Sequence, residues 1–266
     1  MRLLCPQLSL NLILALGVAF GATERASALA EDTFGSASAE DREPSRDRGW
    51  SGPWAGDAML ASAADMQAAS GSLPLPAGVT PPPSGGRVVG FSGLAFRGLA
   101  VGEELQWQSP EPWLIRIAVR RTAVDAGAVS VGVNLLFHDR LQRVVLAGCT
   151  TSGRMVIVHG RTTTASEDPV NGTDHGYVWL VKFDAPDHEG RRVIRLRSFH
   201  ESEPWPNAEP EAWTISTEPI PGDATIDRIG IAAGANVLAE LDEFRIARSW
   251  TQLNAAPQPP DDAPKQ

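Results

Sequence analysis

The chain has 266 residues, of which 42% are hydrophobic and 21% charged, with 25 Gly and 21 Pro. Its formal net charge of −9 at pH 7 argues against nucleic acid or an anionic lipid surface as a partner, since proteins bind both through positive charge. The length is sufficient for one large all-β domain, and the two cysteines are too few for a disulfide-rich scaffold.

The N-terminus has the pattern of an export signal. One positive charge precedes an apolar run, densest over residues 8–20, and the small residues Ala28 and Ala30 fit an A-x-A cleavage site. We therefore expect residues 1–30 to be a signal peptide, the mature chain to begin near Glu31, and the protein to be secreted, periplasmic or attached to the cell surface. A membrane anchor is the alternative, although the apolar run is shorter than the roughly 20 residues of a spanning helix. We expect no membrane span after removal of the signal.

Removal of this segment would also remove Cys5, which leaves Cys149 as the single thiol of the mature chain. A lone thiol cannot form an internal disulfide, so the domain has to be stabilised by its hydrophobic core. Cys149 ends an apolar, strand-like run, and we expect it to be buried and unreactive.

Many short apolar segments separated by turn residues predict an all-β fold. Several alternate with period 2: Ile115, Ile117 and Val119 face one way, and Arg116, Ala118 and Arg120 face the other. The predicted strands cover residues 88–91, 113–120, 129–137, 143–147, 154–158, 177–184, 191–199, 225–232 and 238–246. This spacing indicates a two-sheet antiparallel jelly-roll sandwich with little helix. Only the Ala-rich residues 57–69 have some helical character.

Several motifs resemble one family of secreted bacterial domains. They are "EDTFG" (31–35), "RGWSGPWAGD" (48–57), "GSLPLPAG" (71–78), "SGGRVVGF" (84–91), "WLVKFD" (179–184), "IDRIGIAAG" (226–234) and "LDEFRIARSW" (241–250). Over roughly residues 32–253 the chain resembles a LamG-like domain of the concanavalin A-like lectin/glucanase superfamily. The resemblance implies two stacked antiparallel sheets whose first and last strands meet. It divides the mature chain into a LamG-like domain, residues 31–253, and a disordered Pro- and Asp-rich tail, residues 254–266.

The acidic residues of the last predicted strand raise the question of catalysis. The superfamily's glucanases carry their acid, helper and nucleophile as Glu-x-Asp-x-Glu or Glu-x-Asp-x-x-Glu. Glu240 and Asp242 fit the first two positions, but Phe244 and Arg245 occupy the fifth and sixth. In a regular strand, Glu243 points to the face opposite to Asp242. We therefore expect no enzyme. The alternative is a glycoside hydrolase or lyase with an active site that the sequence pattern does not reveal.

Two groups of oxygen-bearing residues are candidates for a structural Ca²⁺, which takes about six to eight oxygen ligands. Asp32 and Asp242 lie in the first and last strands, which the resemblance brings together. Asp168, Asn171 and Asp174 lie in one turn-rich loop. The alternative in both places is hydrogen bonding or ion pairing within the protein. The five histidines show no zinc-ligand spacing, and no other cofactor is expected.

A Pro- and Glu-rich loop, "HESEPWPNAEPEAWTI" (200–215), contains two tryptophans that could form a sugar-binding platform. Trp205 and Trp213 would flank a shallow carbohydrate site, with Glu203 and Asn207 binding sugar hydroxyls; alternatively, the rings only seal the sandwich edge. We expect an exported, non-catalytic module that binds polysaccharide, a cell-surface glycan or another extracellular partner. A structural module of the cell envelope without a small ligand is a further alternative.

Overall fold

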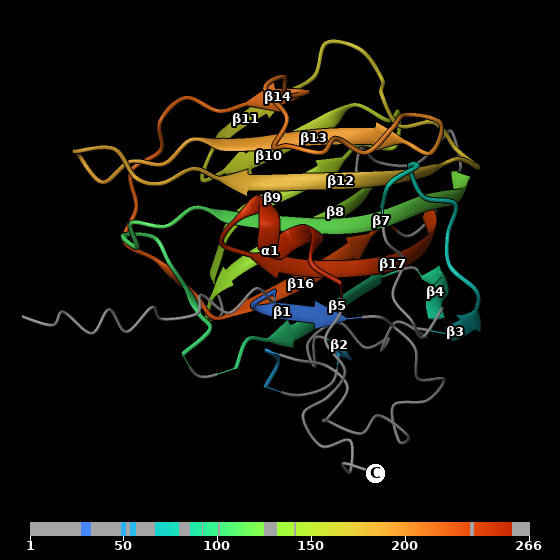
Figure 1. Ribbon diagram of the computed structural model, residues 1–266, viewed down its shortest axis with the longest axis horizontal. Coiled ribbons are helices and arrows are strands. Elements are labelled where there is room, and N and C mark those ends of the chain that lie inside the picture. Colours follow the sequence, from blue (N-terminus) through green and yellow to red (C-terminus); the bar gives the residue numbers. More distant parts are fainter. Residues whose placement is uncertain are drawn as a thin grey trace, which may run out of the picture.

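The computed structural model describes residues 28–32, 49–51, 54–56, 67–79, 86–91, 93–100, 102–124, 132–140, 142–234 and 237–256. These residues form two antiparallel sheets that stack as a sandwich, with one short helix on the outer side of one sheet (Figure 1). This arrangement confirms the predicted all-β fold. Within the described part of the chain, no helix is both long enough and apolar enough to cross a bilayer.

The first sheet contains the two ends of the domain. Its strand order is β14-β13-β12-β7-β17-β4-β3, and β1 pairs with β17 beside this path. The strands are β1 (Ala30–Asp32), β3 (Gln67–Ser70), β4 (Gly86–Phe91), β7 (Trp113–Val124), β12 (Gly176–Phe183), β13 (Ile194–His200), β14 (Ile215–Ser216) and β17 (Val237–Ala247). Because Ala30 pairs with Ile246 and Asp32 with Phe244, the first and last described strands are neighbours, as the resemblance implied.

The second sheet has the strand order β11-β10-β9-β8-β16-β5-β2. Its strands are β2 (Ala55–Gly56), β5 (Gly93–Gly98), β8 (Val133–Asp139), β9 (Gln142–Cys149), β10 (Met155–His159), β11 (Thr162–Ala165) and β16 (Arg228–Ala233). A separate two-stranded ribbon joins β6 (Leu105–Gln106) to β15 (Thr225–Ile226). The predicted strands coincide with observed strands to within a few residues at either end over the described residues, except that the predicted strand 225–232 is divided into β15 of the ribbon and β16 of the second sheet.

The main core fills the space between the sheets. Ile115, Ile117 and Val119 of β7 point into it, and all three are at most 1% exposed. Aromatic rings meet there edge to face, with 5.0 Å between the ring centroids of Phe137 and Phe183. Burying side chains of this size stabilises the fold by about 1.5–3 kcal/mol each. Cys149 lies in the same core as a free thiol, and desolvation raises its pKa, which agrees with the expected unreactive cysteine.

The outer face of the first sheet is also covered. A second apolar cluster lies on it, formed by Leu73, Val79, Leu114, Ala118, Val178, Leu180, Phe199, Trp205, Ala247 and Leu253. Leu253 belongs to the helix α1 (Trp250–Asn254), which begins at Ser249, whose hydroxyl accepts a hydrogen bond from the backbone N–H of Gln252 at 3.2 Å. The central strands of the first sheet are therefore buried on both faces.

Two expectations about the chain need correction. Residues 67–69 of the predicted helical segment 57–69 belong to strand β3, and residues 57–66 lie outside the described residues. The expected tail begins inside the fold, because Asn254 is the last residue of α1 and the carbonyl of Ala255 accepts a hydrogen bond from the side chain of Arg245 at 2.7 Å. Residues 257–266 lie outside the described part of the chain.

Candidate functional site

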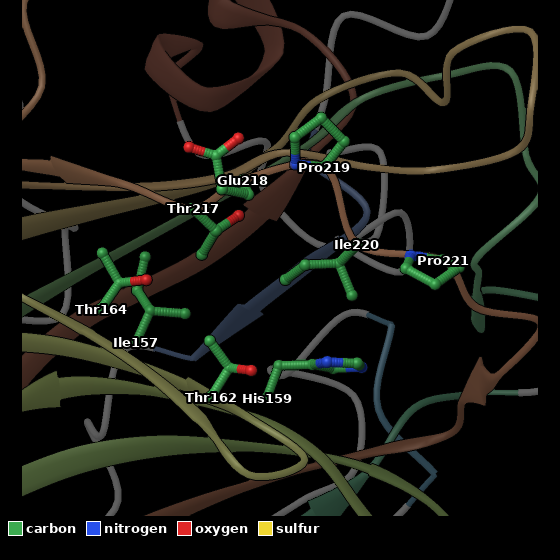
Figure 2. A pocket seen from close by; sticks show the side chains of 9 residues that line it. All are labelled: Ile157, His159, Thr162, Thr164, Thr217, Glu218, Pro219, Ile220 and Pro221. Atoms are coloured by element: carbon green, nitrogen blue, oxygen red, sulfur yellow. The ribbon is translucent and has the colours of Figure 1, made fainter.

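A cavity lies at the rim of the sandwich, where the edge strands of the two sheets meet (Figure 2). It is bounded by β10 and β11 on one side and by the segment after β14 on the other, and its volume is about 210 Å³. The lining residues are Ile157, His159, Thr162, Thr164, Thr217, Glu218, Pro219, Ile220 and Pro221. The volume is below the roughly 300–1,000 Å³ of sites for drug-sized ligands, so the cavity suits a small ligand.

One wall of the cavity is a β-hairpin. β10 and β11 are joined by a short turn that contains Gly160, whose φ of +55° is readily adopted by glycine. Ile157 pairs with Thr164, and His159 with Thr162, so these four side chains point to the same face of the hairpin. Because Ile157 belongs to the main core, this face looks into the space between the sheets. The cavity is thus the open end of that space.

The opposite wall is held by hydrogen bonds to β13 and to the segment just before it. At Thr217, the backbone N–H donates to the carbonyl of Ile194 at 2.9 Å, and the hydroxyl accepts from the N–H of Ile194 at 3.0 Å. At Ile220, the backbone exchanges two hydrogen bonds with Arg192. Pro219 and Pro221 have restricted φ angles, which further limits the motion of this wall. The site is therefore formed before a ligand arrives.

A buried arginine supports this wall from behind. The side chain of Arg192 donates hydrogen bonds to the carbonyls of Trp107, Glu111 and Asp184, and its guanidinium lies 4.3 Å from the ring centroid of Trp113. Desolvation lowers the pKa of Arg192 to about 10, so the side chain remains charged at neutral pH. These contacts to backbone oxygens hold together several segments at this end of the domain.

The lining offers both polar and apolar contacts. Thr162 and Thr164 contribute hydroxyls, and Glu218 contributes the single carboxylate among the lining residues. Burial lowers the pKa of His159, so its imidazole is neutral at pH 7 and provides one donor and one acceptor. Ile220 and the proline rings form the apolar part. Most glycosidases use two carboxylates on one substrate, and the lining residues supply one.

Sequence reasoning did not find this cavity. Its polar residues come from a run of threonines and from "TEPIP" (217–221), two segments that are far apart in the chain and match no recognised motif. The only local signal is the pair of prolines around Ile220, which predicts a rigid connection but no ligand.

The two tryptophans of the loop 200–215 do not form an exposed pair. Trp205 is 7% exposed and stacks on Trp250, with 5.3 Å between the ring centroids. Its indole N–H donates to Oδ1 of Asn254 at 2.8 Å. Trp213 is partly buried and packs against the same apolar cluster on the outer face of the first sheet. Trp205 therefore acts as a packing residue that joins this loop to α1, which corrects its expected place in a sugar platform.

The polar residues predicted beside these rings lie apart from the cavity. Glu203 accepts a hydrogen bond from the backbone N–H of His200 at 2.8 Å and so stabilises the turn that follows β13. Asn207 is exposed on the same loop. Neither residue lines the cavity described above.

Asp32 and Asp242 do not share a metal site, because they point to opposite faces of the first sheet. Asp32 is 4% exposed, and its carboxylate binds Arg97 and the indole N–H of Trp54 between the two sheets. Asp242 points to the outer face, where its carboxylate accepts a hydrogen bond from the backbone N–H of Leu73 at 2.9 Å. Asp32 therefore forms an ion pair, which is the alternative to a metal site. Its partner, Arg97, belongs to β5 of the second sheet.

The loop residues Asp168, Asn171 and Asp174 differ in burial: Asn171 is buried, whereas the two aspartates are exposed. Asn171 is 3% exposed, and its side-chain oxygen accepts hydrogen bonds from Trp179 and Ser198, each at 3.0 Å. Asp168 and Asp174 are exposed. With its oxygen used by two donors on the first sheet, Asn171 acts as an anchor for the loop rather than as a calcium ligand.

The acidic strand β17 contains a β-bulge. Between the pairs Asp242–Ala118 and Arg245–Arg116, two residues of β17 stand against one residue of β7. The bulge residue Glu243 has a φ of +56°, and its carboxylate lies 2.6 Å from Arg116 on the outer face. The regular-strand prediction for Glu243 is therefore wrong, because the extra residue places Glu243 on the same face as Asp242.

Although the three carboxylates of β17 share a face, a substrate cannot reach them. Glu240 is 8% exposed, Asp242 0% and Glu243 2%. Arg120 binds both carboxylate oxygens of Glu240 at 2.6 Å, and Arg116 binds Glu243. This face lies beneath the apolar cluster that contains α1. The cluster of charges is thus part of the packing of the domain.

The comparisons with known proteins assign the chain to no family. No family model matches the chain, and no curated protein matches it. Among solved structures, it is similar to lectin II from Ulex europaeus in complex with galactose, with 7% identity, a TM-score of 0.39 and coverage of 62% of this chain and 88% of that one. For human galectin-16 the identity is 11% and the TM-score 0.34, with coverage of 57% of this chain and 99% of that one. For an alginate lyase from Corynebacterium sp. the identity is 8% and the TM-score 0.37, with coverage of 58% of this chain and 68% of that one. These likenesses assign no function to the chain.

Proposed function

We propose that this protein is a carbohydrate-binding module that holds one sugar ring in the cavity between the β10–β11 hairpin and residues 217–221. The observation that supports this proposal is the composition of the preformed site. Hydroxyls and a neutral imidazole on the hairpin face a wall that carries Ile220, two proline rings and the carboxylate of Glu218. A sugar needs such a combination, because its hydroxyls form hydrogen bonds and its ring carbons contact apolar surface.

The proposal includes two further points. The module is non-catalytic, which is supported by the single carboxylate in the cavity lining. It is exported, which is supported by the signal-peptide pattern of residues 1–30. Its partner would then be a polysaccharide or a cell-surface glycan that presents a terminal or side-chain sugar, since the cavity is too small for several rings.

The test combines a glycan array with calorimetric titration of the best ligand. We expect Thr164→Val to weaken binding about two- to tenfold, because it removes one neutral hydrogen bond. Glu218→Gln should weaken it about tenfold or more, because hydrogen bonds to a charged group are stronger.

Thr163→Val is the matched control. Thr163 lies on the same strand and is exposed, but successive strand residues face opposite sides, so its hydroxyl does not line the cavity. Its affinity should equal that of the unmodified protein. Equal losses in Thr163→Val and Thr164→Val, or no binding to any glycan by the unmodified protein, would refute the proposal.

A further inference from the structure

Two histidines and a glutamate meet at one end of the first sheet, away from the sugar cavity. His175 immediately precedes β12, His200 is the last residue of β13, and Glu201 follows it. Tyr177 pairs with His200, and the backbone N–H of Glu201 donates to the carbonyl of Gly176 at 2.9 Å. The end of one antiparallel strand pair therefore places three possible metal ligands together.

The distances suit a small metal ion. One ligand atom from each of His175, His200 and Glu201 lies within 4.8 Å of the other two. Nδ1 of His175 is 3.5 Å from Oε1 of Glu201. Tetrahedral Zn²⁺, with metal–ligand bonds of about 2.0–2.2 Å, requires about 3.3 Å between neighbouring ligand atoms. This pair is thus close to the required separation, and small side-chain rotations would bring in the third ligand.

Neighbouring groups form hydrogen bonds with two of these three side chains and hold them in place. Oε2 of Glu201 accepts a hydrogen bond from the backbone N–H of Gly176 at 2.7 Å, and this bond, followed by the nearby histidines, lowers the pKa of Glu201. Nδ1 of His200 accepts a hydrogen bond from the backbone N–H of Ser202 at 3.1 Å and lies 2.7 Å from the Ser202 hydroxyl, and these contacts fix the orientation of the ring. The His175 side chain is 54% exposed and that of Glu201 28%, so an ion can enter from solvent.

We propose that His175, His200 and Glu201 form a Zn²⁺ site whose fourth position is taken by water. Two imidazoles and one carboxylate favour zinc over calcium, which prefers six to eight oxygens. The proposal is independent of the sugar cavity, because that cavity's wall is bonded to Ile194 at the start of β13 whereas His200 ends the same strand, about 20 Å away. A bound ion would fasten the start of β12 to the turn after β13.

The test is a zinc titration of the untagged chain, freed of metal, in competition with a chromogenic chelator. We expect one Zn²⁺ per chain. His175→Ala and Glu201→Gln should each weaken zinc binding at least tenfold, and Ca²⁺ should not compete. Glu201→Gln is the conservative variant, because an amide oxygen can still accept the hydrogen bond from Gly176.

The matched control is His188→Ala. His188 is 86% exposed and has only Glu189 as a neighbouring ion-pair partner among the described residues, so its loss should leave zinc binding unchanged. X-ray absorption at the zinc edge should show two imidazole ligands in the unmodified protein. Absence of a stoichiometric site, or equal weakening by His188→Ala and His175→Ala, would overturn the proposal.

Discussion

Replacing Asp242 with Asn should make the stability of the fold less sensitive to pH. Asp242 is 0% exposed, and desolvation raises the pKa of its carboxyl from 3.8 to about 7, although the N–H groups of Leu73 and Glu243 act in the opposite direction. A carboxyl with a raised folded-state pKa binds its proton more tightly in the folded chain than in the unfolded chain. Below about pH 4 this carboxyl therefore does not reduce the free energy of unfolding. As the pH rises it lowers the free energy of unfolding increasingly, and above about pH 7 the reduction is complete.

The magnitude follows from the shift of the Asp242 pKa. About three pKa units at 1.36 kcal/mol each give a full penalty of about 4 kcal/mol. Between pH 5 and pH 8, the unmodified protein should lose about 2–3 kcal/mol of unfolding free energy through this group. Asn has no proton to lose, so the Asp242→Asn variant should lack this loss. Asn can accept only one of the two backbone hydrogen bonds, which costs about 1–3 kcal/mol at every pH and leaves the slope unaffected.

The assay is urea unfolding, followed by tryptophan fluorescence, at pH 5, 6, 7 and 8. Both chains share every other titrating group, so the difference between their unfolding free energies isolates Asp242. That difference should move in favour of the variant by about 2–3 kcal/mol over this range. Asp168→Asn, which removes an exposed carboxylate, should retain the pH dependence of the unmodified protein. Parallel pH profiles for Asp242→Asn and the unmodified protein would refute the reasoning.

Two further predictions concern the other buried charges and the N-terminus. Asp32→Ala leaves Arg97 buried without its carboxylate and should reduce the unfolding free energy by about 3–5 kcal/mol, whereas Asp32→Ala combined with Arg97→Met should recover much of the loss in the same urea assay. If the exported chain is processed, we expect cleavage after the A-x-A of residues 26–28 rather than after Ala30. Ala30 is 0% exposed in β1, and the N–H of Leu29 donates to the carbonyl of Ile246 at 2.7 Å. Intact mass should give Leu29 as the first residue; Glu31 there would contradict this expectation.

The strands could be predicted because their signal is local. Ile115, Ile117 and Val119 alternate with polar or small residues, and this alternation follows directly from the two faces of a strand. β5 was missed, although its residues 93–98 form a full strand in the second sheet. Its sequence, "GLAFRG", has glycine at both ends and a charged residue that points inward. Arg97 faces the core, where Asp32 from the other sheet binds it, and no local pattern indicates that partner.

The candidate sites could be predicted less well, because they depend on backbone details and on contacts between distant segments. Glu243 faces outward owing to one bulge residue with positive φ, which no spacing rule reveals. Trp205 is buried because α1 returns across the sheet and places Trp250 against it. From the sequence alone, a tryptophan in a Pro- and Glu-rich loop is expected to be exposed.

The sequence by itself determined the all-β sandwich, the positions of its main strands and the buried state of Cys149, because hydrophobic periodicity reports which side chains must avoid water. Only the tertiary structure decided which polar groups meet. Thr164 faces Thr217 across the cavity because the edge strands of two sheets come together, and His175 meets His200 because β12 and β13 are paired in one register. Such sites depend on strand pairing and sheet closure, which sum many weak interactions over the whole chain and leave no mark in any short segment.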